Sequence, residues 1–185
     1  MREKKLVLEF PKIEDKADWL KYVEEFHESN PESHPLDFHI GENFEEWLKK
    51  KEDERAGRNL EEGRVSSSVF FLKREGEGRI LGHVSIRHSI DNEFLAEVGG
   101  HIGYGVRPSE RGKGYATEML QLALAECKKL GITNAMITCK KNNLASAKVI
   151  SNNGGVKRDE INFRGEAFNR YDFKLKQNRQ KEMKE

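Results

Sequence analysis

A short run of small and basic residues has the composition of a phosphate site: Arg111-Gly112-Lys113-Gly114-Tyr115-Ala116-Thr117. It stands between an apolar stretch typical of a strand and a stretch whose apolar residues recur at helical spacing. Glycines let the backbone approach a ligand closely, and the first turn of a helix presents unpaired N–H groups at the positive end of its dipole. The run is therefore predicted to bind phosphate, with Arg111 and Lys113 adding positive charge.

Two better-known phosphate motifs do not fit this run. A P-loop requires G-x-x-x-x-G-K-(S/T), but Gly112-Lys113 is followed by Gly114, and Arg107 stands where the first glycine is needed. The dinucleotide fingerprint G-x-G-x-x-G needs a third glycine, and Thr117 occupies that position. The residues alone leave an ordinary tight turn as the alternative to a phosphate site.

The elements that must position this run change type along the chain. Apolar runs closed by turn residues predict strands at residues 6–10, 68–73, 80–88 and 96–106, an antiparallel meander with helices after residues 15 and 44. The charged stretch 42–64 is either a mobile flap over a substrate site or a solvated helix. An amphipathic helix from Ala116, a buried strand at 135–139, a helix from Asn143 to Ile150, and strands at 156–163 and 169–175 then complete the pattern.

Length and composition limit the domain organisation. The 185 residues are 35% charged and 36% hydrophobic, which predicts one domain over residues 1–175 and a charged, frayed tail over residues 176–185. Cys127 and Cys139 each sit in an apolar pattern, so they are expected to be buried thiols and not a redox or metal pair. We therefore expect a reduced, cytoplasmic compartment and no bound metal.

Charge and hydropathy argue against two classes of partner. Thirty-three basic residues nearly balance 32 acidic ones, so the net charge of +1 gives no global attraction to nucleic acid or to an anionic membrane. The basic residues of 174–184 are interrupted by Glu182 and have no interleaved aromatic residue. No segment approaches the roughly 18–20 apolar residues of a membrane span, and the apolar run near the start is too short for a signal peptide.

The chain resembles the GNAT superfamily of acetyl-CoA-dependent N-acetyltransferases. Arg111-x-x-Gly114-x-Ala116 matches that superfamily's coenzyme motif, (Q/R)-x-x-G-x-(G/A). Val106-Arg107-Pro108 resembles its V-x-P lead-in, and Asn143-Leu144-Ala145-Ser146 resembles the N-x-x-(S/A) at the start of its fourth helix. The likeness is specific over residues 96–156. Residues 86–88 and 99–104 are also similar to an uncharacterised bacterial subgroup, which names no substrate.

The resemblance implies an α+β (α/β mixed) fold, with a mostly antiparallel sheet splayed between its fourth and fifth strands and coenzyme A in the opening. The backbone N–H groups of Arg111, Gly112, Lys113, Gly114, Tyr115, Ala116 and Thr117 would bind the pyrophosphate. The backbone of Tyr104, Gly105 and Val106 would pair with the pantetheine arm, and the N–H of Val106 would polarise the thioester carbonyl. Asn143 and Ser146 would contact the coenzyme, although Asn143 is also suited to capping a helix.

The implied reaction is direct attack of a primary amine, from a small molecule or a peptide, on acetyl-CoA. Glu97 is the first candidate for the general base and His101 the second, since both are expected on the strand that leads to Val106. An unbroken strand would put both on one face, unless Gly99 and Gly100 insert a bulge.

Three further expectations remain open. Arg87 and His88 would line the acceptor pocket. Many members place a tyrosine acid in the fourth helix, but Ile150 stands there, so no acid is assigned. The alternative function is a non-catalytic acetyl-CoA-binding sensor or interaction module, and because dimers are frequent in the superfamily, a homodimer is allowed.

Overall fold

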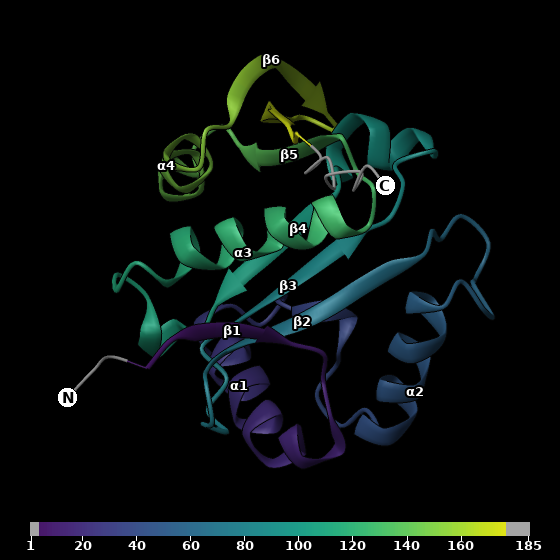
Figure 1. Cartoon of the computed structure of the whole chain (residues 1–185), viewed down its shortest axis with the longest axis vertical. Coiled ribbons are helices and arrows are strands. Elements are labelled where there is room, and N and C mark those ends of the chain that lie inside the picture. The colour runs from purple at the N-terminus through teal and green to yellow at the C-terminus, as the bar shows by residue number, and fades with distance from the viewer. Residues whose placement is uncertain (1–3, 177–185) are drawn as a thin grey trace, which may run out of the picture.

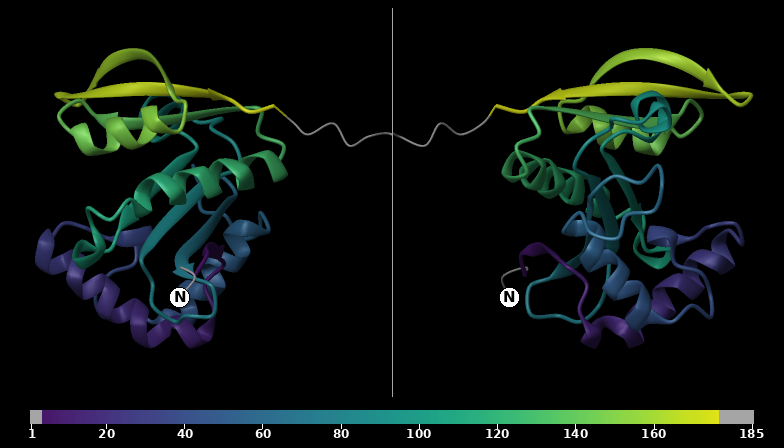
Figure 2. Two further views of the ribbon diagram at one scale, coloured as in Figure 1. Left: turned by 60° about the vertical axis from the view of Figure 1, so that its left-hand side comes forward. Right: turned by 90° about the vertical axis from the view of Figure 1, so that its right-hand side faces the viewer.

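The computed structural model describes residues 4–176, which form two antiparallel sheets. The first contains β1 (Leu6–Glu9), β2 (Ser67–Arg74), β3 (Gly82–Arg87) and β4 (Ile102–Val106) in that order, and the second has the order β5 (Asn134–Lys140), β7 (Glu166–Lys174), β6 (Val156–Phe163). Helices α1 (Lys16–Ser29) and α2 (Phe44–Arg55) cover one face of the first sheet, and α3 (Tyr115–Lys129) lies on the other (Figure 1). The remaining helix is α4 (Leu144–Asn152). The second sheet lies at the far end of the molecule from α1 and α2 (Figure 2).

The first sheet is held between two separate cores. On the α1–α2 face, Trp19 stacks on Phe71 and Trp47, with ring centroids 4.7 and 5.4 Å apart. On the other face, the buried stripe of α3 packs against β3 and β4; it comprises Met119, Leu120, Ala123, Leu124 and Cys127. Both cysteines are buried and free, as expected, and burial raises the pKa of Cys127 to about 12. Each face of the sheet is therefore covered by its own helices, so the middle strands are fixed from both sides.

Strands β4 and β5 form the predicted splay. They share no ladder and meet only at one end, where the His101 N–H donates to Met136 O at 2.8 Å and the Met136 N–H donates to His101 Nδ1 at 3.0 Å. Gly100 makes this approach possible, because an added Cβ would lie 2.6 Å from Met136 O and the residue has φ +61°. The expected opening between the fourth and fifth strands is confirmed.

The strand predicted over residues 96–106 is correct only from Ile102 onward. Leu95–Gly99 is instead a helical turn of the π type, in which Gly100 N–H donates to Leu95 O at 2.8 Å. The Asn92 side chain accepts from the Leu95 N–H at 2.8 Å, and Leu95 and Val98 bury the apolar side of the turn. The expectation that Glu97 lies on the strand leading to Val106 is therefore wrong, and the condition for a face shared with His101, an unbroken strand, is not met, because a helical turn and Gly100 with its positive φ separate the two residues.

The charged stretch 42–64 contains α2, which packs against β2 through Phe44 and Trp47. Among residues 4–176, no helix is long and apolar enough to cross a membrane. The tail predicted over residues 176–185 lies outside the described residues, apart from residue 176.

Candidate active site

The phosphate run folds as a tight loop that opens α3. Gly112 and Gly114 adopt φ of +79° and +85°, and Gly114 is the residue that precedes the first helical turn. No atom would lie within 4 Å of a Cβ at either position, so glycine is needed there for its backbone conformation and not for space. The loop therefore depends on both glycines to turn the chain into the helix.

Five consecutive backbone N–H groups of this loop, residues 112–116, have no acceptor within residues 4–176. The two ends of the predicted set are engaged: Arg111 N–H donates to Pro108 O at 3.4 Å and Thr117 N–H to Gly114 O at 3.0 Å. Unpaired N–H groups at the start of a 15-residue helix favour an anion through both hydrogen bonds and the helix dipole. The geometry thus suits phosphate at residues 112–116, one residue shorter at each end than the sequence suggested.

The side chains of the loop are already partnered. Lys113 Nζ lies 2.7 Å from Glu110 Oε2, and this hydrogen bond holds the pKa of Glu110 below its ordinary value. The Arg111 guanidinium stacks over Phe26 at 5.5 Å, and its Nε donates to Val106 O at 3.3 Å. Tyr115 accepts a hydrogen bond from Arg74 on β2. The loop's affinity for an anion would therefore come mainly from its backbone.

Strand β4 presents a free backbone edge to the opening. Arg87 N–H donates to His101 O, and Arg107 N–H donates to Leu81 O. The backbone N–H and C=O groups of the odd-numbered residues of β4 therefore point toward β3. Because backbone groups alternate in direction along a strand, those of Tyr104 and Val106 face away from β3, and no strand among the described residues pairs with them. The contact from Arg111 to Val106 O agrees with this direction.

The N-terminal end of α4 closes part of the opening. The Asn143 side chain accepts from the Ser146 N–H at 3.1 Å, so the helix-cap role of Asn143 is confirmed. The Tyr104 hydroxyl lies 2.8 Å from Ser146 Oγ and joins β4 to α4. Burial raises the pKa of Tyr104, which keeps this hydroxyl protonated. Ile150, by contrast, is buried in the core.

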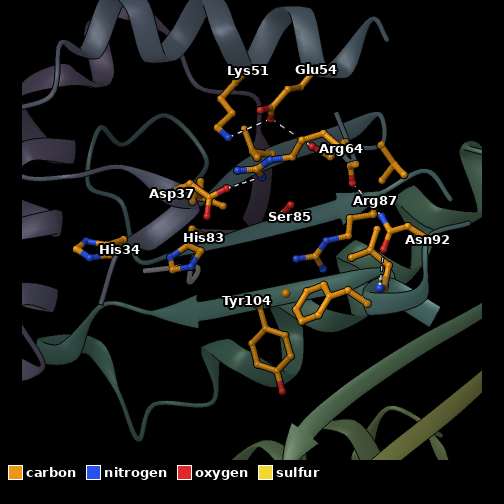
Figure 3. A pocket seen from close by; sticks show the side chains of 18 residues that line it. His34, Asp37, Lys51, Glu54, Arg64, His83, Ser85, Arg87, Asn92 and Tyr104 are labelled. Atoms are coloured by element: carbon orange, nitrogen blue, oxygen red, sulfur yellow. Dashed lines mark hydrogen bonds and ion pairs between the residues drawn. The ribbon is translucent and has the colours of Figure 1, made fainter. Parts of the chain in front are cut away.

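A cavity of about 580 Å³ lies under α2 and the loop before it, on the face of β3 and β4 that is opposite to α3. The side chains of His83, Ser85 and Arg87, at every second position of β3, point into it (Figure 3). Gly103 leaves room beside Arg87. Tyr104 also lines it. Strand β4 therefore lines this cavity with one face and turns its free backbone edge toward β5.

Most of the charges in this cavity are paired. Arg64 donates to Asp37 Oδ2 at 2.9 Å, and Lys51 donates to Glu54 Oε2 at 3.0 Å. Burial alone would raise the pKa of Asp37, but the hydrogen bond from Arg64 and the charge of Lys51 hold it below its ordinary value. Glu54 is buried, and its Oε1 has no hydrogen-bond partner among the described residues.

His83 is held in its neutral form. The Tyr22 hydroxyl lies 2.6 Å from His83 Nδ1, and burial lowers the pKa of His83 to about 3. At neutral pH the ring therefore adds no charge to the cavity.

The predicted proton-transfer residues lie elsewhere. Glu97 is exposed on the helical turn, and His101 is buried with Nδ1 committed to the Met136 N–H. Neither lines the cavity, whereas Arg87 does. His88 does not line it either, and its Nε2 lies 2.9 Å from Ser68 Oγ. No cluster of three or more His, Cys, Asp or Glu residues within 4–176 is arranged to hold a metal ion.

Sequence reasoning missed several cavity residues. His83 and Ser85 could have been found, because they alternate with Arg87 at the period of two that places side chains on one strand face. Asp37, Lys51, Glu54 and Arg64 carry no such signal, since they reach the cavity from α2 and the loops around it.

Comparisons with known proteins identify the family and the fold of this chain. A family model described as an acetyltransferase (GNAT) domain matches residues 5–156. The Microcin C7 self-immunity acetyltransferase MccE, solved with acetyl-CoA and AMP, is 15% identical over 94% of this chain and 94% of that one, with a TM-score of 0.68.

Two further solved structures are similar over most of the chain. A ribosomal-protein-S5-alanine acetyltransferase from Vibrio fischeri is 18% identical, with 95% and 96% of the two chains covered and a TM-score of 0.68. RimJ from Mycobacterium smegmatis, solved with a CoA disulfide, is 18% identical, with 95% and 84% covered and a TM-score of 0.67. At these identities the likeness shows a shared fold. A search of curated protein sequences found no match.

Proposed function

Because the chain belongs to the GNAT acetyltransferase family, we propose that it moves an acetyl group from acetyl-CoA to a primary amine by direct attack. The observation that carries the proposal is the row of five N–H groups at residues 112–116 that find no acceptor in the described part of the chain, next to the free edge of β4. An anion-binding helix start and an unpaired strand edge suit the two parts of coenzyme A, its pyrophosphate and its amide-containing arm. MccE, which shares the fold, was solved with acetyl-CoA.

Each part of the site has a role in this proposal. The N–H groups of residues 112–116 bind the pyrophosphate, and the backbone of Tyr104 and Val106 pairs with the pantetheine amides. The N–H of Val106 then points toward the thioester carbonyl and stabilises the oxyanion that forms when the amine attacks. Asn143 and Ser146 border the arm from α4.

The amine reaches the thioester from the cavity on the other side of β4, which Gly103 and Tyr104 line. An alkyl ammonium has a pKa of about 10, so it must lose a proton before it attacks. The neutral nitrogen then forms a bond to the carbonyl carbon and releases its second proton to solvent, the C–S bond breaks, and the coenzyme leaves as a thiolate. Glu97 and His101 remain the predicted bases, although both lie outside the cavity wall.

A tyrosine from β4 replaces the missing acid of the fourth helix in this mechanism. The Tyr104 hydroxyl is protonated and reaches α4 at Ser146, on the side of β4 where the coenzyme arm is placed. It can donate its proton to the departing thiolate and recover one through Ser146 and solvent.

Calorimetric titration with acetyl-CoA tests the coenzyme site, with 3′,5′-ADP and NADH as comparison ligands. We expect saturable binding of acetyl-CoA and none of NADH. Gly114→Ala should abolish this binding, because its φ of +85° disfavours any side chain and the loop would refold. Gly165→Ala is the matched control, since Gly165 has φ +84° and equally open surroundings in the turn between β6 and β7. Acetyl-CoA binding that survives Gly114→Ala would contradict the placement of the pyrophosphate.

The alternative is a module that binds acetyl-CoA without catalysis. Release of free coenzyme thiol in the presence of an amine panel separates the two: binding without any turnover would favour the sensor or interaction module.

A further inference from the structure

Arg87 is a half-buried guanidinium whose hydrogen-bonding capacity is only partly used. It projects from β3 into the cavity, where its NH1 group donates to Gly99 O at 3.1 Å and to Gly100 O at 3.3 Å. Its Nε and NH2 groups have no acceptor within residues 4–176, and no carboxylate there lies within ion-pair distance. Figure 3 shows the guanidinium among the cavity side chains with no dashed line joining it to any of them. Three N–H donors therefore remain available, and two of them, Nε–H and one hydrogen of NH2, lie side by side on one edge of the planar fork.

The rest of the cavity does not neutralise this charge. Lys51 is paired with Glu54 and Arg64 with Asp37, so three cations face two carboxylates and the cavity holds one positive charge in excess. The negative charge of Asp37 acts on the pKa of Arg87, but the Asp37 carboxylate already accepts a hydrogen bond from Arg64. A partly buried charge without a counter-ion is unfavourable, and a ligand that supplies the counter-charge relieves that penalty.

The position of Arg87 relates the unpaired N–H groups of its guanidinium to the place of reaction. A Cβ added to Gly103 would lie 3.9 Å from Arg87 NH1, so the guanidinium stands beside β4. Gly103 and Val106 are three residues apart, which is about 10 Å along a strand. One small molecule can therefore span this separation, with one of its groups bound to Arg87 and its amine placed for attack near Val106. Ser85, on the same face of β3, adds a hydroxyl to the cavity wall.

We propose that the acceptor is a small amine that also carries a carboxylate, and that this carboxylate binds the free edge of the Arg87 guanidinium. The proposal rests on the acetyl-transfer function proposed above. A planar carboxylate accepts two parallel hydrogen bonds from such a fork, which Lys cannot offer in the same geometry.

The test compares each of a panel of free amino acids, including those with the amine distant from the carboxylate, with its carboxamide. The wild-type protein should acetylate the best free acid at least about tenfold more efficiently, in kcat/KM, than the matching amide. Arg87→Gln should lower kcat/KM for the acid about 10- to 100-fold, chiefly through KM, and leave the amide unchanged. Arg87→Lys, which keeps the charge and a donor toward the Gly99 carbonyl, should lie between the two.

A double variant, Asp37→Asn with Arg64→Gln, is the matched control, because it removes a paired cation and anion and leaves the excess charge in place. It should keep the preference for the acid. Equal use of acids and amides by the wild type, preference for an amine bearing phosphate such as phosphoethanolamine, or an equal loss on both substrates in Arg87→Gln would each overturn the proposal. Acetyl-CoA binding without acetylation of any carboxylate-bearing amine would also overturn it, whereas absence of acetyl-CoA binding would instead contradict the proposed function.

Discussion

Substitution of Gly100 should damage the point at which β4 and β5 meet. A Cβ there would lie 2.6 Å from Met136 O and 3.2 Å from Met136 C, both backbone atoms that cannot rotate away. The residue also has φ +61°, which costs a side chain about 1–2 kcal/mol. Relief of the clash would separate the strands and lose the two His101–Met136 hydrogen bonds, at about 0.5–1.5 kcal/mol each. The expected loss for Gly100→Ala is therefore about 2–5 kcal/mol in the free energy of unfolding.

Urea denaturation followed by tryptophan fluorescence measures this loss, because Trp19 and Trp47 are both buried in the aromatic core. At about 2–4 °C per kcal/mol for a chain of this size, the melting temperature should fall by about 4–20 °C. Gly76→Ala is the control: Gly76 has φ +74° but no atom within 4 Å of the added Cβ, so it reports the conformational strain alone. If the two variants lose the same stability, the contact with Met136 does not hold the strands together and the reasoning is refuted.

The remaining predictions concern turnover and pH. Glu97→Gln should lower kcat about 10²–10⁴-fold without changing acetyl-CoA affinity if Glu97 is the base, and unchanged turnover at every pH would remove it from the mechanism. Tyr104→Phe should lower kcat while acetyl-CoA affinity measured by calorimetry stays the same; a parallel loss of affinity would point to a binding role instead. Burial lowers the pKa of His83 from 6.5 to about 3, so the unfolded chain takes up a proton below pH 6.5 that the folded protein refuses. Stability should therefore be greatest above that pH and fall by up to about 1.4 kcal/mol per pH unit between the two pKa values. His83→Gln should flatten this slope in urea titrations, whereas His27→Gln, at an exposed position, should leave it unchanged.

Strand β4 is where the two halves of the proposed reaction come together. The backbone groups of its even-numbered residues point toward the opening with β5, and on the cavity side Gly103 leaves space beside Arg87, whereas the His83 ring fills the space beside Gly105. A buried network fixes the segment that follows it: Arg107 donates to Asp18 at 2.9 Å and to Glu25 at 2.6 Å on α1. These hydrogen bonds anchor the segment between β4 and the phosphate loop to α1.

The sequence alone was sufficient for the elements whose signals are local. The helical spacing of Met119, Leu120 and Ala123 predicted α3, and the glycines at 112 and 114 predicted the loop before it, because conformations with positive φ and apolar periodicity depend on near neighbours. The Asn143 cap belongs to the same class.

The turn that carries Glu97 and the cavity charges depended on the tertiary structure. Residues 95–99 are small and apolar enough to read as a strand, and only the packing of Leu95 and Val98, with the cap from Asn92, selects a helical turn. The sequence predicted Arg87 as a pocket residue, but it did not show that the cavity holds an excess positive charge. That excess depends on which carboxylates form ion pairs with Lys51 and Arg64, and folding brings these residues together from distant segments. The backbone conformation of these local elements depends on neighbouring residues, whereas the balance of charge in a cavity depends on the side chains that folding brings together from far apart.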